Sequence, residues 1–279
     1  MPPRRLRLDA ELVRRGLARS REQASELIAA GRVSVNRAVA TKPATGVTTD
    51  ADLVVREDAD DPGYASRGAH KLAGALDAFA QAGLEVRGRR CLDAGASTGG
   101  FTDVLLRRGA REVVAVDVGY GQLVWTLRND PRVHVHDRTN VRDLTPELVG
   151  GPVDLVVGDL SFISLTLLAD ALVGVVRPDG DLVLMVKPQF EVGKDRLGKG
   201  GVVRQEGHRV DAVQQVLEAY AVRGWGSRAL TASPLPGPSG NVEFFAWMRQ
   251  GPAEVGRDQV EAEVARSASW GVAGERVGP

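Results

Sequence analysis

The sequence predicts an α/β fold, with helices on both faces of a mostly parallel sheet, preceded by a small α+β domain. Three observations predict it. Strand-like and helix-like segments alternate between residues 90 and 248, which is typical of parallel strands joined by crossover helices. Two short amphipathic helices and a strand precede this region. The chain has 279 residues and is 43% hydrophobic, enough for one large domain or two smaller ones.

Charge and cysteine content narrow the class of protein. The formal net charge is +0, yet residues 1–42 carry ten Lys and Arg against four Asp and Glu. This distribution is typical of a small polyanion-binding module, although a solvated arginine-rich surface is an equal alternative. The single cysteine, Cys91, excludes an intrachain disulfide, and residues 1–13 lack an apolar signal segment. Three aspartates make the most apolar stretch, 153–176, a poor membrane span. We therefore expect a cytoplasmic protein that does not bind membranes.

The N-terminal segment predicts a compact unit. Residues 7–16 read as a short helix that ends at Gly16, and Ser20 opens a second helix that ends at Gly31. Residues 32–36 alternate like a strand. Six arginines are spread among these elements: Arg14, Arg15, Arg19, Arg21, Arg32 and Arg37.

This arrangement resembles the alpha-L RNA-binding domain of a small-subunit ribosomal protein and of several RNA-modifying enzymes. The resemblance covers about residues 6–60 and rests on the spacing G-L-x-x-S-R-x-x-A-x-x-L-I-x-x-G-x-V-x-V-N. We assign residues 1–60 to this domain, and the resemblance implies that the six arginines bind RNA.

The rest of the chain predicts a larger domain over residues 67–249. Residues 56–66 are acidic and turn-rich, and we place a linker at 61–66. Predicted strands are 90–94, 112–117, 132–136, 153–158, 181–186, 227–232 and 241–248. Predicted helices are 67–83, 100–108, 121–128, 163–176 and 206–222. Residues 250–279 lose apolar periodicity and predict a mostly disordered tail with a short helix at 258–266.

The stretch "CLDAGASTGGFTD" (91–103) suits two kinds of site. Residues 95–99 match the G-x-S-x-G nucleophile elbow of a hydrolase, which would make Ser97 a nucleophile. The same strand-to-helix turn also suits a Gly-rich loop that holds a nucleotide-like cofactor.

An acid after the next strand favours the cofactor loop. Asp117 lies 22 residues after Gly95, where a cofactor with a ribose needs a hydroxyl acceptor. A hydrolase needs an acid followed by a histidine, and Asp154 or Asp159 followed by His208 would satisfy that order. However, His208 begins an amphipathic helix, where an exposed polar residue is the better interpretation. We keep the hydrolase as an alternative.

The loop lacks the G-x-G-x-x-G of dinucleotide sites and the lysine of a P-loop. It resembles the S-adenosylmethionine loop of class I methyltransferases, which have a Rossmann-like sheet. The resemblance implies that Asp93 orients the loop or the aminoacyl end, that Asp117 holds the ribose and that Asp137 lies near the adenine. From the sequence alone, Asp93 also suits a strand-end acid that caps the turn, and this role can coexist with the first. An ordinary turn aspartate is a nearly equal interpretation of Asp137. The remaining implied cofactor residues are Gly95, Ser97, Gly99, Gly100 and Phe101.

Four ionisable residues near element ends carry the predicted chemistry: Lys71, Asp159, Lys187 and Glu243. Glu243 lies inside an apolar strand-like segment, so its burial requires a partner. Lys187 ends an apolar run at the expected ligand edge, although a lysine there is commonly just snorkelling to solvent. Lys71 alone, on a predicted surface helix, is uninformative. The segment "GDLSFISL" lacks the [ND]-P-P-[FYW] pattern of enzymes that methylate base amino groups. Methylation of pyrimidine carbon 5 needs a nucleophilic cysteine, but Cys91 opens a predicted strand, where a small buried residue is usual. Both subtypes are therefore disfavoured.

Together the four match the Lys-Asp-Lys-Glu tetrad of ribose 2′-O-methyltransferases of the RrmJ/FtsJ type. With the alpha-L domain in front, residues 6–249 resemble the TlyA family, also called hemolysin A. The motifs are "SRGAHKL", "LDAGASTGGFTD", "GDLSFISL", "VKPQFE" and "NVEFF". The resemblance implies transfer of a methyl group from S-adenosylmethionine to cytidine 2′-hydroxyls in 16S or 23S ribosomal RNA, free or in ribosomal subunits. It implies no metal and no obligate protein partner. Alternatives are a membrane-active hemolysin and a non-catalytic RNA-binding or ribosome-assembly factor.

Two further expectations concern the reaction. Lys187 either accepts the hydroxyl proton or stays charged and stabilises the developing alkoxide. Residues 190–203 are Gly-rich and contain Lys194, Arg196 and Lys199, which predicts a mobile loop that contacts RNA phosphate. A solvated surface loop is the near-equal alternative.

Overall fold

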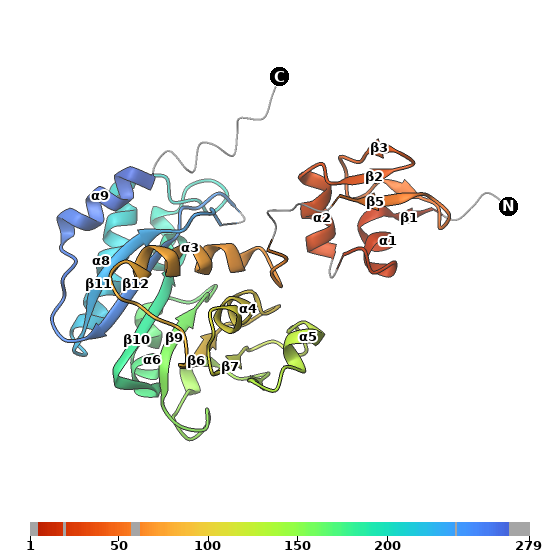
Figure 1. Ribbon diagram of the computed structural model, residues 1–279. Helices are drawn as coiled ribbons and strands as arrows, with labels where there is room; N and C mark the ends of the chain where they lie inside the picture. The colour runs from red at the N-terminus through yellow and green to blue at the C-terminus, as the bar shows by residue number, and fades with distance from the viewer. Residues whose placement is uncertain (1–4, 19–20, 57–61, 238, 268–279) are drawn as a thin grey trace. The chain divides into compact units, whose positions relative to one another are not determined.

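The computed structural model describes residues 5–18, 21–56, 62–237 and 239–267 (Figure 1). The chain divides into two compact units, Met1–Gly63 and Tyr64–Pro279. The division falls inside the segment that the sequence marks as a linker. Each unit has its own hydrophobic core, and the two are described separately.

The N-terminal unit packs two helices against two small sheets. Its core is built from apolar residues of both helices and of the central strand, including Leu8, Leu12, Ala24, Ile28 and Val33. The elements are α1 (Leu8–Arg14), α2 (Arg21–Ala29), a sheet in the order β3-β2-β5 (Ala38–Val39, Val33–Val35, Leu53–Val55) and the pair β1 with β4 (Leu6–Arg7, Gly46–Val47). Residues 19 and 20 lie outside the described residues, so the predicted Ser20 cap does too.

The larger unit is built on a seven-stranded sheet in the order β11-β12-β10-β9-β6-β7-β8. The five strands from β10 to β8 in this order are parallel to one another. Strand β12 runs antiparallel to both of its neighbours, β10 and β11. The bounds are β6 (Arg90–Ala94), β7 (Glu112–Val116), β8 (Val133–His136), β9 (Val153–Gly158), β10 (Val176–Val186), β11 (Trp225–Ala232) and β12 (Phe244–Gln250). The mostly parallel sheet is confirmed.

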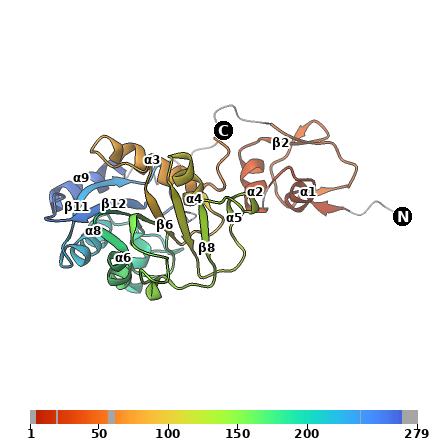
Figure 2. The same ribbon diagram turned by 60° about the horizontal axis from the view of Figure 1, so that its bottom comes forward.

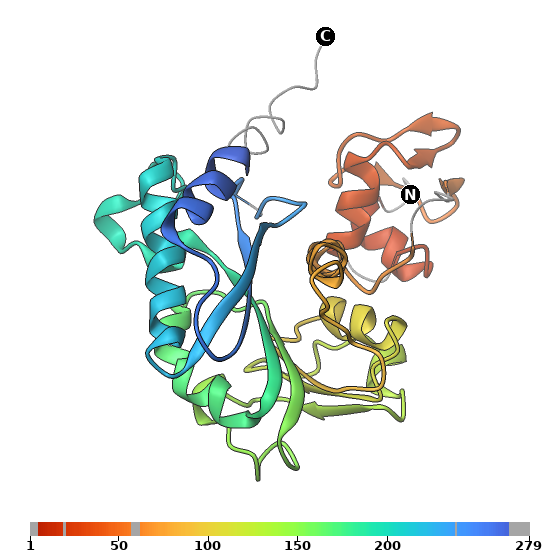
Figure 3. The ribbon, with the colours of Figure 1, turned by 60° about the vertical axis from the view of Figure 1, so that its left-hand side comes forward.

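Helices cover both faces of this sheet, as predicted (Figures 2 and 3). Alternation along β6 illustrates why: Leu92 and Ala94 pack on one face with α6, α8 and α9, whereas Cys91 packs on the other with α3, α4 and α5. The bounds are α3 (Gly68–Ala80), α4 (Gly100–Arg107), α5 (Trp125–Arg128), α6 (Ala169–Val175), α8 (Glu206–Ala221) and α9 (Arg257–Ser267). Short elements are η1 (Val141–Asp143), η2 (Leu165–Leu168), α7 (Pro188–Glu191) and η3 (Lys194–Arg196).

Several boundaries differ from the sequence prediction, and three of them concern the tail and the strands β10 and β12. Part of the predicted disordered tail forms α9, which packs on α8 and β11 because Val260 and Val264 are buried. The helix expected there at 258–266 is present, and residues 268–279 lie outside the described residues. Strand β10 begins at Val176 and crosses an irregularity before Asp181. Strand β12 begins at Phe244, so Glu243 precedes the strand instead of lying within it.

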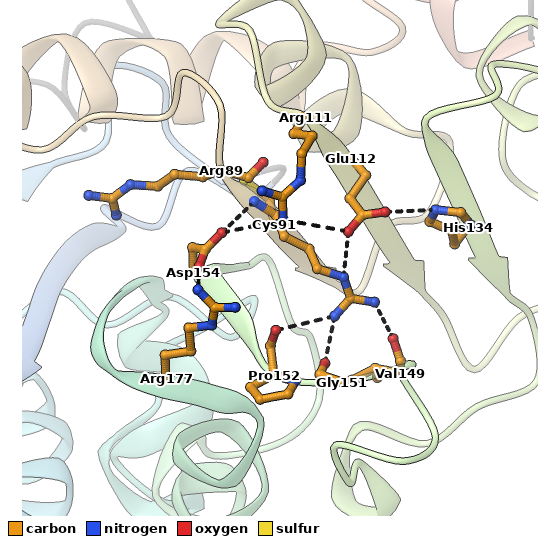
Figure 4. A network of polar contacts seen from close by, with 11 residues as sticks. Arg89, Cys91, Arg111, Glu112, His134, Val149, Gly151, Pro152, Asp154 and Arg177 are labelled. Atoms are coloured by element: carbon orange, nitrogen blue, oxygen red, sulfur yellow. Dashed lines mark hydrogen bonds and ion pairs between the residues drawn. The ribbon is translucent and has the colours of Figure 1, made fainter.

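The amino ends of the parallel strands are joined by a polar network around Arg90, the first residue of β6 (Figure 4). Its guanidinium lies 2.7 Å from Glu112 Oε1 and donates to the carbonyl oxygens of Val149 and Gly151, each at 2.5 Å. Its backbone N–H donates to Asp154 Oδ2 at 2.8 Å. Further contacts join Glu112 to His134 and Asp154 to Arg177. The network therefore ties the starts of β6, β7, β8, β9 and β10 together.

Candidate active site

Five strands of the sheet place candidate residues at its opposite edge. Parallel strands β6, β7, β9 and β10 end there, and β12 begins there because it runs in the opposite direction. Ligands of open α/β sheets bind beyond this carboxyl edge. The topology therefore brings Asp93, Asp117, Asp159, Lys187 and Glu243 to one edge, although they are spread over 150 residues of sequence.

Lys71 and Glu243 form a buried ion pair at this edge. Lys71 Nζ lies 2.5 Å from Glu243 Oε2, and the two residues are only 7% and 1% exposed. The side-chain amide of Gln189 also reaches Glu243, with Nε2 3.4 Å from Oε1. The prediction that the Glu243 side chain needs a partner is confirmed. Lys71 is buried because it lies on the face of α3 that packs on the rest of the domain, so the position of the helix alone did not reveal its burial.

Lys187 and Asp159 form a second pair beside the first. Lys187 Nζ lies 2.5 Å from Asp159 Oδ1 and donates to Ser161 Oγ at 2.8 Å. Lys187 is buried, so it does not snorkel to solvent. A Cβ placed on Gly68, at the start of the helix that carries Lys71, would lie 3.8 Å from Asp159 Oδ2. The structure thus gathers all four predicted residues into two adjoining lysine–carboxylate pairs.

Phe162 is a candidate site residue that was not among the residues predicted from the sequence. It follows Asp159 in the loop after β9, is 91% exposed and has a φ of +64°. Its ring lies 5.2 Å from that of Phe190. A non-glycine residue in the left-handed region is uncommon, and a fully exposed phenylalanine offers a stacking surface. The available sequence signal was an aromatic residue in a serine-rich loop directly after a strand-end aspartate.

The cofactor loop is held in shape by Asp117. Its two carboxylate oxygens accept the backbone N–H groups of Ser97 at 2.8 Å and of Gly119 at 2.6 Å. Ser97 has a φ of +46°, and its hydroxyl lies 3.4 Å from the side-chain oxygen of Gln122. His134 instead contacts Glu112 at the amino edge, and His208 lies on α8. Among the described residues, no histidine contact activates Ser97, which argues against the nucleophile elbow.

The glycines of the loop are required by the protein itself. A Cβ on Gly95 would lie 2.8 Å from the Asp159 carbonyl oxygen, and Gly95 has a φ of +85°. A Cβ on Gly99 would meet Leu127, and one on Gly100 would meet Ser66 Oγ. These contacts differ from the predicted purpose, which was close approach of a cofactor. Phe101 is likewise a core residue, because its buried ring packs on Phe245.

Asp93 supplies a feature that suits a bound ligand. It is fully buried, and its Oδ2 accepts the Thr102 hydroxyl at 2.7 Å. Its Oδ1 is buried and has no hydrogen-bond partner within the described chain. Burial, with nearby Asp159 and Asp117 adding negative charge, raises the pKa of Asp93 to about 7. An unpaired buried acceptor of this kind fits a donor group on a cationic cofactor.

Comparison with known proteins decides the family. Residues 64–250 match the FtsJ-like methyltransferase family and residues 6–53 match the S4 domain. The 16S/23S rRNA (cytidine-2′-O)-methyltransferase TlyA of Mycobacterium tuberculosis is 61% identical over 246 residues, 88% of this chain and 90% of that protein. The chain belongs to the TlyA family of FtsJ-like methyltransferases.

Other TlyA-family relatives carry a different name. Hemolysin A of Brachyspira hyodysenteriae is 36% identical, over 86% of this chain and 98% of that protein. The solved structure of a protein named as a hemolysin from Streptococcus thermophilus is 34% identical, has a TM-score of 0.78 and covers 98% of this chain and 99% of that one. In the residues described here, no helix has the length and apolarity needed to span a bilayer.

The S4 domain of this TlyA-family chain uses its arginines unequally. Arg14 and Arg21 reach the buried carboxylates of Glu11 and Asp9, at 2.6 and 2.9 Å, yet their side chains are 56% and 59% exposed. Arg15 is 23% exposed and donates to the carbonyl oxygens of Ala51 and Thr49 as well as to Glu11. Arg15 is thus mostly committed to the fold.

The other predicted RNA-binding arginines differ in placement. Arg32 donates to the carbonyl oxygen of Arg56 at 3.1 Å, and Arg37 lies exposed in the left-handed turn between β2 and β3. Arg19 lies outside the described residues. Asp137, the residue expected near the adenine, pairs with Arg128, whose hydrogen bond lowers the pKa of Asp137.

The loop 190–203 of the methyltransferase domain is anchored at its carboxyl end. The Asn241 side chain accepts the N–H of Val203 at 2.9 Å and donates to the carbonyl oxygen of Gly201 at 3.0 Å. Arg196 pairs with Asp211 on α8 at 3.1 Å, whereas Lys194 and Lys199 are exposed. Its predicted mobility and contact with RNA stay predictions.

Proposed function

We propose that this chain transfers a methyl group from S-adenosylmethionine to the 2′-hydroxyl of cytidine in 16S or 23S ribosomal RNA. The observation that carries the proposal is the pair of lysine–carboxylate contacts, Lys71 with Glu243 and Lys187 with Asp159, at the ligand edge of a methyltransferase domain. The name of the 61% identical relative supplies the substrate class. We infer from this substrate class that the protein acts in the cytoplasm, on ribosomal RNA or ribosomal subunits.

The residues around the loop 95–99 would hold the cofactor. Asp93 Oδ1 would accept a donor from its aminoacyl end, and Asp117 and Asp137 would face its ribose and adenine. When bound, S-adenosylmethionine supplies an electrophilic methyl group on a sulfonium centre. The protein must then position the ribose hydroxyl and manage its proton.

Lys187 is the residue proposed to act on that hydroxyl. Its Nζ already meets two acceptors, Asp159 Oδ1 and Ser161 Oγ, so an ammonium would have one more proton to donate. We propose that Lys187 stabilises the negative charge that develops on the hydroxyl oxygen. The hydroxyl proton would leave to water beside Asp159, which is partly exposed. Lys71 and Glu243 would fix the helix α3 and the start of β12 around this point.

Recognition of RNA would use both units. An exposed Phe162 ring beside the two pairs would stack on the base of the target nucleotide, since single-stranded RNA bases commonly stack on aromatic side chains. Exposed arginines of the S4 domain, Arg14 and Arg21 among them, would contact phosphates. The 2′-hydroxyl itself excludes DNA as a substrate.

The test is methyl transfer to ribosomal RNA. Purified protein is incubated with 16S RNA, 23S RNA or ribosomal subunits and labelled S-adenosylmethionine, and 2′-O-methyl sites are mapped. We expect label on a cytidine ribose, lost in the Lys187→Ala variant. RNA binding without transfer would instead identify an assembly factor, and leakage of liposomes at physiological salt would identify a membrane-active protein.

A further inference from the structure

Two segments that follow neighbouring strands lie side by side at the proposed site. Residues 159–165 follow β9, and residues 187–191 follow β10. Three successive contacts join them, from Lys187 to Asp159 and Ser161, from Phe190 to Phe162, and from Glu191 to Ser164 and Leu165. The first two contacts involve residues already placed in the site, and the third does not.

Glu191 makes the third contact with both carboxylate oxygens. Oε1 accepts the backbone N–H of Leu165 at 2.9 Å, and Oε2 accepts the hydroxyl of Ser164 at 2.5 Å. Ser164 Oγ in turn accepts the N–H of Thr166 at 3.2 Å. Glu191 and Ser164 thus satisfy the first N–H groups of η2, which have no partner within that short helix. Glu191 is buried, and burying a carboxylate costs free energy unless hydrogen bonds compensate for the lost water. The contacts with Ser164 and Leu165 provide that compensation.

The loop that Glu191 holds is strained. Phe162 has a φ of +64°, in a region that L-residues with large side chains rarely adopt. Such a conformation costs free energy and persists only where the surrounding contacts impose it. Lys187 fixes the loop on the N-terminal side of Phe162, through Asp159 and Ser161. Glu191 fixes it on the C-terminal side.

We propose that Glu191 is a positioning residue for the methyl transfer. It holds residues 159–165 in the conformation that presents Asp159 to Lys187 and exposes the Phe162 ring at the site. Glu191 itself points to Ser164 and Leu165 and needs no contact with RNA or cofactor. The inference rests on the proposed function for its kinetic consequences and on the structure alone for its conformational ones.

Three variants test the proposal kinetically. Glu191→Ala removes both acceptors, so we expect kcat to fall about 10²-fold, the size of effect that a misplacement of about 1 Å produces. The Kd of S-adenosylmethionine should stay within about twofold, because the loop 95–99 is untouched. Glu191→Gln keeps an oxygen for Leu165 and a polar partner for Ser164, and should retain most of kcat. Glu218→Ala, which removes an exposed glutamate on α8, is the matched control. An unchanged kcat in Glu191→Ala, or equal loss in the Ala and Gln variants, would overturn the proposal.

Hydrogen exchange separates this inference from the proposed function. The Leu165 N–H donates to Glu191, so peptides covering 159–167 should exchange faster in Glu191→Ala and at the native rate in Glu191→Gln and Glu218→Ala. This readout needs no substrate. If the native protein transfers no methyl to any RNA, the proposed function fails, and the exchange rates still decide whether Glu191 holds the loop. Native exchange rates in Glu191→Ala would show that it does not.

Discussion

The two edges of the seven-stranded sheet use charged residues in opposite ways. At the amino edge, carbonyl and carboxylate oxygens surround Arg90, and these contacts join the start of β6 to the start of β7 and to the segment before β9 (Figure 4). At the carboxyl edge, the lysines and carboxylates pair across segments that leave the sheet. That edge also holds an unpaired buried oxygen on Asp93 and left-handed backbone at Ser97 and Phe162.

We interpret the amino edge as organised for stability and the carboxyl edge as organised for ligands. A satisfied network of mostly surface charges needs nothing further and contributes to the fold. Unpaired buried acceptors and strained backbone cost free energy, and they cluster where a ligand or substrate completes the arrangement. Substitutions at the two edges should therefore separate activity from stability, and pH should affect the two edges differently.

The largest effect is expected at Lys187. Lys187→Ala should lower methyl transfer about 10²–10⁴-fold, because the group that meets the hydroxyl is lost. Cofactor and RNA binding, measured by calorimetry and filter binding, should stay near native values. Appreciable transfer by Lys187→Arg would support the charged role, since a guanidinium stays protonated. Near-native transfer by Lys187→Ala would contradict the assignment of the tetrad.

Asp93 should carry a stability cost that depends on pH. Because its pKa is raised to about 7, the folded protein binds an extra proton between about pH 4 and pH 7. The free energy of unfolding of the cofactor-free protein should therefore fall as the pH rises through this window, by on the order of 4 kcal/mol.

The Asp93→Asn variant tests this linkage. It has no charge to bury, so denaturation at pH 5 and pH 8 should show less pH dependence and greater stability than the native protein at pH 8. The variant should also bind S-adenosylmethionine more weakly, which ties the stability cost to the ligand. The same loss of stability between pH 5 and pH 8 in both proteins would contradict this account.

Arg90 should show the reverse pattern. Arg90→Ala leaves the carbonyl groups of Val149 and Gly151 without this donor and removes one of the partners of Glu112, and we expect about 2 kcal/mol lower stability in chemical denaturation. Transfer per folded molecule should be unchanged below the unfolding transition. A fall in kcat as large as that of Lys187→Ala would show that the two edges are not separate.

The smallest effect is expected in the N-terminal unit. Its buried Glu11 is paired with arginines, as Glu112 is at the amino edge of the sheet. Hydrogen bonds from Arg14 and then Arg15 lower the pKa of Glu11 to about 2. The lowered value means that these contacts stabilise the unit above about pH 4, and that the contribution is lost as the pH falls toward 2. Glu11→Gln should reduce the thermal midpoint of this unit at pH 7, and the difference from the native protein should vanish near pH 2. A difference of equal size at both pH values would refute this.

The sequence by itself determined most of the fold and singled out the candidate site residues. Apolar alternation located the strands, because buried parallel strands require runs such as "LVLMV". The chain also fixed which ionisable residues stand at strand ends, and the resemblance of its motifs to a known family named their chemistry.

Only the tertiary structure decided how those residues are paired and what the loops require. Sequence gave no sign that Lys71 is buried, since that depends on which face of α3 meets the sheet. The sequence pattern explains the glycines at 95, 99 and 100 by a cofactor loop. In the structure, a Cβ at these positions would collide with Asp159, Leu127 and Ser66, which are distant in sequence. Phe162 and Glu191 gained their roles only from a strained φ and from contacts between two loops. The physical reason is the same in each case: composition and periodicity report local preference, whereas burial, pairing and strain arise from segments that meet only after folding.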